Sequence, residues 1–594
     1  MAYLTIAPLL AVAIGALLGV LLEAVVPRRA RFVAQTWLAA AVIVVALGFT
    51  GRNWWDDTSR RLAGFGSVSV DTATVIIWAG LLVFGLGSVV LAAQRFAHAP
   101  GTSGVGVSSF TPMAVAAPGS VDEREAEAKG GEHTEVFPLM MFALTGMLLL
   151  PAASDLLTAF IGLEVLSLPL YLLTALARRR RLISHEAALK YFLLGAFSSA
   201  VYLYGAALVY GYASSSEYCG AIRQVGQAGG EVAGCGADFR AIDMALANTL
   251  GRDPLLLAGF GLLMVGLLFK VGAVPFHAWV PDTYTGAPTP VTAYMAVGTK
   301  VASVGALMRL LYVAFGGLQW TWLIPVAIVA ALTMAVGSVF GLTQTNIKRL
   351  LAYSSIAHVG FVLAPIAAAV SVTTIEALTS MSAVVYYLAA YGLATLGAFA
   401  VVMVVRDGTG EVVDLAAWAG IGRRHPWVGA AMTLFLCSLA GIPATAGFIG
   451  KIDAFVVAWQ GGLWWLVLLG LVFSLVAMVF YMRVVLTIWF AKAGEQPAAP
   501  APEAPKAPED ASDDDAPTAV MQAVHPDDEA PAAVEPEVPE EPDDAPPASP
   551  VAGVDRVPKS LAILMGLCAA GTLAAGLYPG LFTHLASLAG QLLR

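Results

Sequence analysis

The sequence predicts an all-α polytopic membrane protein with about fourteen transmembrane helices. Of its 594 residues, 58% are hydrophobic and only 12% are charged, and the mean hydropathy is +0.77. A soluble chain carries about a quarter charged residues, so this chain has too few to cover a globule in water. Apolar runs of about 20 residues, enough to cross a bilayer as a helix, recur along its whole length. These observations exclude a cytosolic enzyme and a nucleic-acid-binding protein.

The predicted spans are the apolar runs between charged or Pro/Gly-rich breaks. They lie near residues 4–26, 33–50, 72–95, 137–152, 154–176, 187–212, 254–280, 290–314, 319–341, 349–370, 374–405, 427–459, 462–492 and 559–588. Basic residues follow the first span but do not precede it, which is typical of a retained helix with an outside N-terminus.

The topology follows from alternating the spans from that outside N-terminus. The basic segments near 178–181, 348–349, 406–424 and 556–559 then fall inside, as the positive-inside rule requires. Fourteen crossings also return the C-terminus to the outside. The sequence therefore predicts a multi-pass membrane protein with both termini outside. Its bias toward Ala, Val and Arg is typical of a high-GC bacterium, so we expect it in the bacterial inner (plasma) membrane.

Composition divides the chain into six parts. They are an N-terminal three-helix extension (1–95), a flexible cytoplasmic loop (96–136), a first repeat (137–314) with an outside loop (213–253), a second repeat (315–493), an acidic Pro-rich linker (494–556) and a C-terminal transmembrane helix (557–594).

The acidic linker hides the charge of the rest of the chain. Residues 495–555 hold 17 Asp and Glu, one basic residue (Lys506) and 14 of the 33 prolines. The net charge of -9 therefore resolves into -16 here and +7 elsewhere. Such a segment buries too little apolar surface to offset its ordering entropy, so we expect it to be disordered. A solvated tether and a docking segment are the two alternatives for its role.

The four cysteines indicate no metal or cluster site. None is part of a CxxC pair, and the chain contains neither a GxGxxG fingerprint nor a P-loop. Cys219 and Cys235 share the outside loop 213–253. In an oxidising compartment a disulfide between them would stabilise the fold by roughly 3 kcal/mol. The alternative is two free thiols.

The candidate functional residues are ionisable groups within the apolar spans. Each costs about 2.5–3.5 kcal/mol at the bilayer centre, so a functional role is the default interpretation. They are Glu164, Lys190, Lys270, Lys300, His358 and Lys451, with His277 just past Lys270.

Several of these residues also have a structural alternative. Glu164 could be an interfacial carboxylate. Lys190 could reach the cytoplasmic interface, or form an ordinary i,i+4 pair with Glu186. The two histidines could be packing residues.

Two of these lysines lie beside helix-breaking sequences. Lys270 precedes Gly272 and Pro275, and Lys451 follows GIPATAG at 441–447. Glycine and proline in a transmembrane helix free backbone groups, which a cavity or a neighbour must satisfy. Interrupted helices in corresponding places indicate inverted repeats around a site near the membrane midplane. We therefore predict two inverted five-helix repeats, spans 4–8 and 9–13, with discontinuous helices 7 and 12.

A row of buried lysines with histidines and one glutamate suits protons better than a bulky solute. The protonation of a buried lysine responds to desolvation and to a nearby carboxylate, so a local charge change can load or empty it. A sugar or amino-acid carrier would need a roomier, hydrogen-bonding pocket.

Four segments carry a family resemblance. They are GLEVLSLPLY (162–171), FKVGAVPFHAWVPDTYTGAPTPVTAYMAVGTK (269–300), TNIKRLLAYSSIAHVGF (345–361) and GIPATAGFIGK (441–451). They resemble the antiporter-like subunits of respiratory complex I, the proton-translocating NADH:quinone oxidoreductase, and are most similar to its subunit N family, the bacterial counterpart of mitochondrial subunit 2. The resemblance covers roughly 137–490 plus the three N-terminal helices.

The resemblance implies a role for each candidate on a proton path. Glu164 resembles the fifth-helix carboxylate that couples to neighbouring subunits. Lys270 resembles the broken-helix lysine at the input channel, Lys190 the modulating residue beside it, and His277 a histidine near the break. Lys300 and His358 resemble the central hydrophilic axis, and Lys451 the terminal lysine.

The resemblance also implies partners and a reaction class. We expect a non-redox translocase subunit with no cofactor or metal of its own, with the flavin, iron–sulfur clusters and quinone in partner subunits. The expected partners are other antiporter-like and small membrane-arm subunits, the lipid bilayer and protons, but no nucleic acid. The alternatives are a subunit of a multi-subunit Na+/H+ antiporter and a membrane scaffold with decayed channels.

Overall fold

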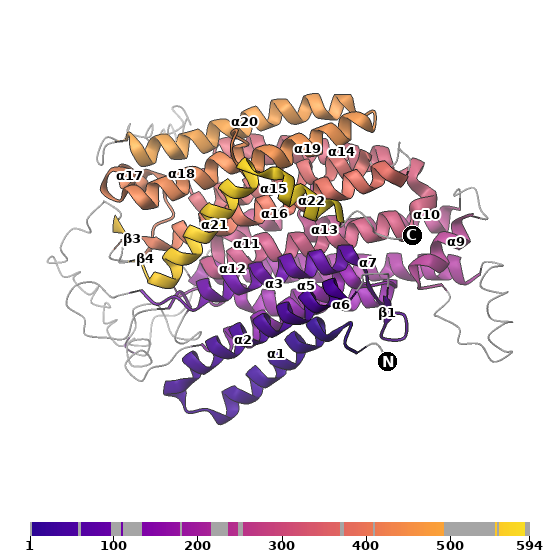
Figure 1. Cartoon of the computed structure of the whole chain (residues 1–594), viewed down its shortest axis with the longest axis horizontal. Coiled ribbons are helices and arrows are strands. Elements are labelled where there is room, and N and C mark those ends of the chain that lie inside the picture. Colours follow the sequence, from indigo (N-terminus) through magenta and orange to yellow (C-terminus); the bar gives the residue numbers. More distant parts are fainter. Residues whose placement is uncertain are drawn as a thin grey trace, which may run out of the picture.

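The computed structural model describes residues 3–56, 61–96, 108–110, 121, 133–178, 181–215, 236–247, 253–368, 374–407, 410–491, 553–554 and 557–588. Within these residues the fold is an all-α bundle whose long helices run side by side (Figure 1). Twelve helical segments are long and apolar enough to cross a membrane, and Val136–Ala152 and Pro426–Ala440 are shorter apolar helices. Each coincides with one of the fourteen predicted spans, so the predicted fold class is confirmed.

The N-terminal extension starts at one edge of the bundle, at the bottom of Figure 1, and its third helix lies further inside. It consists of α1 (Ala7–Val25), α2 (Arg28–Trp55), the hairpin strands β1 (Arg61–Ala63) and β2 (Val68–Val70), and α3 (Thr72–Ala92). The two strands pair antiparallel.

The region predicted as the first repeat follows. Its helices are α5 (Val136–Ala152), α6 (Leu156–Thr174), α7 (Arg181–Ser214), α9 (Phe239–Ala247), α10 (Pro254–Val271), α11 (Trp279–Gly286), α12 (Thr289–Tyr294) and α13 (Lys300–Arg309). Two π-helices that the sequence did not reveal flank α13, η1 (Met295–Thr299) and η2 (Leu310–Ala314), and the 3-10 helix η3 (Gly316–Leu318) follows.

The region predicted as the second repeat begins with α14 (Gln319–Leu342). It continues with α15 (Ile347–Ala368), α16 (Thr374–Val404), the strands β3 (Val405–Asp407) and β4 (Gly410–Glu411), the 3-10 helix η4 (Leu415–Trp418), α17 (Ile421–Arg424), α18 (Pro426–Ala440), α19 (Ala446–Gln460) and α20 (Trp464–Trp489). Strand β5 (Gly553–Val554) and helices α21 (Lys559–Leu577) and α22 (Pro579–Leu588) come last.

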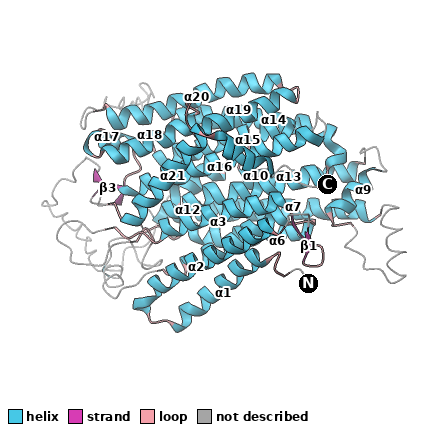
Figure 2. Cartoon of the chain, viewed as in Figure 1, coloured by secondary structure: helices cyan, strands magenta, loops and turns pink. Residues whose placement is uncertain are grey.

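The few strands lie at the ends of the bundle, outside the predicted spans (Figure 2). Strand β3 pairs antiparallel with β4 and also with β5, so the chain just before α21 joins a sheet begun in the loop after α16. These strands could not be predicted from the sequence, because two- or three-residue strands have no periodic pattern.

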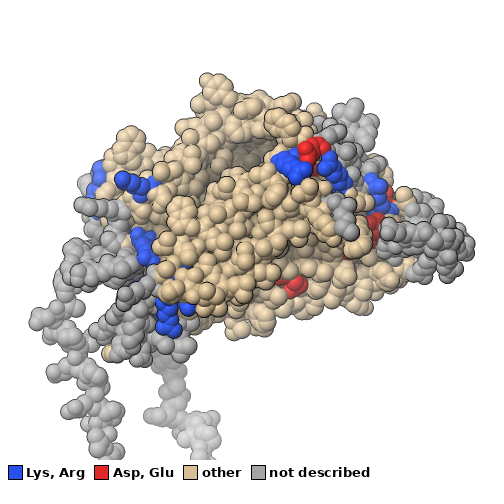
Figure 3. Space-filling model, turned by 60° about the horizontal axis from the view of Figure 1, so that its bottom comes forward, with Lys and Arg blue, Asp and Glu red and all other residues tan. Residues whose placement is uncertain are grey.

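The distribution of charge and apolar side chains matches a membrane protein. Lys and Arg gather toward the two ends of the bundle, and the broad surface between them is almost uncharged (Figure 3). Large apolar side chains such as Phe197, Leu475 and Leu567 are exposed. An apolar surface of this extent would be an aggregation liability in water, but it suits lipid.

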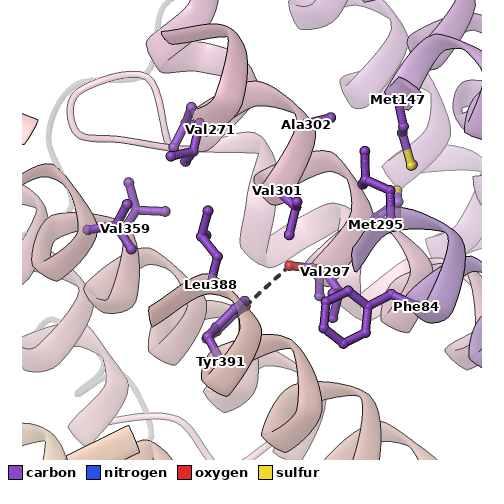
Figure 4. Packing of buried hydrophobic residues seen from close by; sticks show 14 of the residues in the cluster. Phe84, Met147, Val271, Met295, Val297, Val301, Ala302, Val359, Leu388 and Tyr391 are labelled. Atoms are coloured by element: carbon purple, nitrogen blue, oxygen red, sulfur yellow. Dashed lines mark hydrogen bonds between the residues drawn. The ribbon is translucent and has the colours of Figure 1, made fainter. Parts of the chain in front are cut away.

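The most deeply buried helices lie at the centre. The most apolar part of α15 is wholly buried, and the segments Thr289–Ala314 and Ser380–Val404 are nearly so. Their packing joins distant parts of the chain: Phe84 of α3, Met147 of α5, Val297 of η1 and Leu388 of α16 belong to one apolar cluster (Figure 4). These central helices carry Lys300 and His358.

Candidate functional site

Two helices break within the bundle, at the places predicted from glycine and proline. Helix α10 ends at Gly272 and α18 ends at Gly441, both in the left-handed conformation with φ of 82° and 85°. In each case the glycine N–H and the next N–H bond back to carbonyls of the last helical turn. Such a left-handed cap still leaves the last carbonyls of the helix to be satisfied by other groups.

A lysine side chain caps the last carbonyl before each left-handed glycine. Lys300 Nζ donates to the Val271 carbonyl at 3.1 Å, and Lys451 Nζ donates to the Ala440 carbonyl at 2.8 Å. Both ammonium groups therefore lie at a helix C-terminus, whose partial negative charge stabilises a cation. At both breaks, therefore, a lysine ammonium bonds the last helical carbonyl. Lys300 comes from a following helix, whereas Lys451 comes from the second half of its own broken helix.

Lys270 lies in the last turn of α10 and is 2% exposed. Its Nζ donates to Ser167 Oγ of α6 at 2.7 Å and to Tyr191 OH of α7 at 3.0 Å. The Nζ also lies 5.8 Å and 5.2 Å from the ring centres of Tyr171 and Tyr191. The ammonium is therefore enclosed by hydroxyl groups and aromatic rings.

Glu164 lies on the same side of α6 as Ser167 and Tyr171, at i, i+3 and i+7. It is partly buried, and its Oε1 has no hydrogen-bond partner among the described residues. Its charge acts on both Lys270 and Tyr171. The structure thus brings the predicted carboxylate and the predicted broken-helix lysine into one electrostatic neighbourhood, with the Ser167 hydroxyl bonded to the lysine.

His358 lies near the middle of the buried helix α15 and is 5% exposed. Its Nδ1 lies 2.8 Å from Tyr387 OH, and its Nε2 lies 3.2 Å from Tyr481 OH. Tyr481 in turn shares a hydrogen bond with Ser354. Three aromatic rings, those of Phe361, Tyr387 and Tyr391, pack around the imidazole. Both ring nitrogens therefore have hydroxyl partners, an arrangement suited to proton exchange.

A small cavity extends from His358 toward the break between α18 and α19. It is lined by His358, Tyr387, Ala390, Tyr391, Ser438, Leu439 and Gly447. The cavity is about large enough for one water molecule. Most of its lining is apolar, but His358, Tyr387, Tyr391 and Ser438 supply polar groups that such a water can bond.

Lys451 lies beyond this cavity and is 5% exposed. Besides the Ala440 carbonyl, its Nζ donates to Ser474 Oγ of α20 at 2.9 Å. The Nζ also lies 5.0 Å from the ring centre of Phe361, which packs against His358. The charges of both Lys300 and Lys451 act on His358, so the imidazole lies near both lysines.

Lys190 lies away from Lys270. Its side chain is 46% exposed and pairs with Glu186 at 2.6 Å and with Asp282 of α11 at 3.1 Å. Asp282 also pairs with Arg349. The next residue, Tyr191, is the one that contacts Lys270. The predicted i,i+4 pair with Glu186 is present, and a modulating role for Lys190 stays a prediction.

His277 lies in the segment between α10 and α11 and is half-buried. Its Nδ1 is buried without a hydrogen-bond partner among the described residues. None of the hydrogen bonds described above joins it to Lys270 or Lys300. Its role on a proton path therefore also stays a prediction.

Two charged features escaped the sequence analysis. Arg309 of α13 pairs with Asp71 at 2.9 Å, with side-chain exposures of only 3% and 0%. Asp453 lies two residues after Lys451 and its charge acts on Tyr386 of α16. Arg309, Asp71 and Asp453 could have been noticed in the sequence, because each is a charged residue inside or beside an apolar span. Their partners lie far away in sequence.

The structure describes two of the four cysteines. Cys219 and Cys235 lie outside the described residues, whereas Cys437 and Cys568 are free thiols. Among the described residues, no three His, Cys, Asp or Glu side chains are grouped closely enough to hold a metal ion.

Comparisons with known proteins agree with one another. The sequence model of the NADH:quinone oxidoreductase/Mrp antiporter transmembrane family matches residues 153–477. NADH-quinone oxidoreductase subunit N of a Nocardioides species is 49% identical over 485 residues, covering 80% of this chain and 86% of that protein. Subunit N of Mycobacterium bovis is 46% identical over 521 residues, covering 84% and 91%.

Solved structures show the same fold. A chain of respiratory complex I from Thermus thermophilus with bound aureothin matches with a TM-score of 0.66 and 28% identity, covering 98% of this chain and 99% of that chain. A chain of the Mrp complex from a Dietzia species matches with a TM-score of 0.70 over 99% and 97% of the two chains. At 19% identity, the second match is evidence of fold alone.

Proposed function

This chain belongs to the NADH:quinone oxidoreductase/Mrp antiporter transmembrane family, and from that premise we propose how its buried charges work. It is a proton-translocating, antiporter-like membrane-arm subunit of a bacterial NADH:quinone oxidoreductase, a membrane protein that functions beside other membrane-arm subunits. The Na+/H+ antiporter alternative is not favoured, because the curated relatives at 45–49% identity are all subunit N proteins.

In this proposal, protons move along the buried row Lys270, Lys300, His358 and Lys451. The observation that supports it most is the position of His358, whose two ring nitrogens meet tyrosine hydroxyls within the buried apolar part of helix α15. Buried ionisable groups are costly in a bilayer and mark ion or proton pathways in membrane proteins.

Glu164 couples this row to neighbouring subunits. A charge change beside Glu164, driven by quinone reduction elsewhere in the complex, alters the field at Lys270, which lies within range of that carboxylate. Moving one charge against 100 mV costs about 2.3 kcal/mol, so the energy has to arrive from outside this chain. We propose that this chain is a non-redox subunit without a cofactor, that flavin, iron–sulfur clusters and quinone belong to partner subunits, and that both termini face the outside.

Lys300→Ala in the assembled complex tests the proposed function. The change removes the ammonium that caps Val271, so we expect the ratio of protons pumped to electrons transferred to fall by the share of this chain, with NADH oxidation retained. The measurement is proton uptake and NADH oxidation in proteoliposomes.

Lys348→Ala is the matched control. Lys348 is also buried and donates to a backbone carbonyl, that of Ala287, but it lies in the first turn of α15, away from the row. We expect the ratio of protons pumped to electrons transferred in Lys348→Ala to equal that of the parent complex. An unchanged ratio in Lys300→Ala would contradict the proposed function.

A further inference from the structure

Lys300 and His358 lack a direct hydrogen bond, and two hydroxyl groups lie between them. Lys300 Nζ donates to the carbonyl of Ser355 at 3.3 Å, and Tyr391 OH bonds Ser355 Oγ at 2.8 Å. The Tyr391 ring centre is 5.2 Å from that of His358, and both residues line the same cavity. Ser355 and His358 also lie one turn apart on α15, and so on one face of that helix.

The Tyr391 hydroxyl has two acceptors for its single proton. One is Ser355 Oγ, and the other is the Ala296 carbonyl at 3.3 Å. Figure 4 shows Tyr391 reaching from α16 toward the helix that carries Met295, Val297 and Val301. Ala296 belongs to the π-helix η1, which ends immediately before Lys300. Such π-helical turns are frequent at functional sites.

A serine hydroxyl both donates and accepts, and so does a phenol. When Tyr391 donates to Ala296, its oxygen is free to accept from Ser355. When it donates to Ser355, the opposite polarity holds. The pair can therefore take up two hydrogen-bond polarities without moving the backbone, which a proton relay requires.

We propose that Tyr391 and Ser355 relay protons between Lys300 and His358. A proton leaves Lys300 Nζ for Ser355 Oγ as the original Ser355 proton passes to the Tyr391 oxygen. The original Tyr391 proton leaves for a water molecule in the cavity. That water passes a proton to the Tyr387 hydroxyl, which also lines the cavity and releases its own proton to His358 Nδ1. Each hydroxyl loses one proton and gains one, so all three hydroxyls and the water stay neutral and one positive charge moves from Lys300 to His358.

The geometry supports each step of this relay. The Lys300 ammonium already bonds the carbonyl of Ser355, so a shift of its flexible side chain brings it to the hydroxyl of the same residue. On the far side, the cavity borders both Tyr391 and His358. The inference rests on the proposed function, because it assigns a connection between two residues of the proposed proton row.

Tyr391→Phe tests the relay, because it removes the hydroxyl and keeps the ring. In the assembled complex we expect the ratio of protons pumped to electrons transferred to fall to that of Lys300→Ala. Tyr386→Phe is the matched control: its hydroxyl, on the same helix, donates to the Ala575 carbonyl at 2.7 Å, and Tyr386 does not line the cavity. We expect Tyr386→Phe to keep the parent ratio.

A second pair of variants distinguishes a relay from a packing role. Ser355→Ala should lower the ratio as Tyr391→Phe does, and Ser355→Thr, which keeps a hydroxyl, should restore it. If Tyr391→Phe does not assemble, the comparison of Ser355→Ala with Ser355→Thr still distinguishes a relay from a packing role. Parent ratios in Tyr391→Phe or Ser355→Ala, together with a lowered ratio in Lys300→Ala, would overturn the relay and leave the proposed function standing. An unchanged ratio in Lys300→Ala would instead mean that the proposed function fails.

Discussion

Lys270→Ala in the assembled complex is expected to abolish the proton translocation of this chain while electron transfer continues. Lys270 supplies the ammonium to a cluster of described residues, namely Ser167, Tyr171, Tyr191 and Glu164, none of which is a cation. Without it, a charge change at Glu164 has no buried ammonium to act on. The measurement is the ratio of protons pumped to electrons transferred in proteoliposomes.

Lys270→Arg separates the charge of this residue from its exchangeable proton. Arginine keeps the cation, but its guanidinium does not deprotonate in proteins. We therefore expect the same loss of translocation as in Lys270→Ala. Lys190→Ala provides the comparison, because Lys190 is half-exposed in its pairs with Glu186 and Asp282, and exposed pairs contribute little. Its effect should be smaller, and a normal ratio in Lys270→Ala would refute the role of Lys270.

The second large effect concerns stability, and it arises at the buried pair between α3 and α13. Asp71→Asn is expected to destabilise the fold by about 3–5 kcal/mol, because it leaves the Arg309 charge buried without a counter-charge. Arg309 would keep its bonds to the Pro151 carbonyl and Thr74 Oγ1, but it would face a neutral amide in place of the carboxylate. The measurement is the thermal stability of the purified complex together with the amount of this chain in membranes.

Asp155→Asn is the matched control for this effect. Asp155 caps α6 through the Thr158 N–H as Asp71 caps α3 through the Thr74 N–H, both at 2.7–2.8 Å. Asparagine is also a good N-cap, so only the loss of the ion pair differs between the two variants. Asp71→Asn combined with Arg309→Met should recover most of the stability. Equal stability of the two single variants would show that the pair contributes nothing.

The fold and the breaks could be predicted because their signals are local. The length of each apolar run predicts a span. Gly272 and Gly441 are each followed within three residues by a proline inside an apolar run, and this combination predicts a broken helix. The lysines could be found because a charge in an apolar helix is conspicuous. The capping of Val271 by Lys300 could not be predicted, since it depends on how α10 and α13 pack.

The hydroxyl network around His358 left no sequence signal. Tyr387, Tyr391 and Tyr481 lie in apolar helices, where a tyrosine is usually a packing residue, and only the tertiary structure turns their hydroxyls toward His358 and Ser355. The ion pair between Arg309 and Asp71 could not be predicted for the same reason, because the two residues are 238 positions apart in the chain. The ion pair between Lys190 and Asp282 could not be predicted either, because hydrophobic periodicity does not show which helices are neighbours.

The central claim is that Lys270, Lys300 and Lys451 act in series on one proton route. Its most direct test compares the proton-to-electron ratio of Lys270→Ala, Lys300→Ala and Lys451→Ala with that of the triple variant, all in the assembled complex. A single route predicts that all four variants give the same lowered ratio with electron transfer retained, because any one break stops the whole path. A ratio that stays at the parent value, or that falls further with each added substitution, would contradict it.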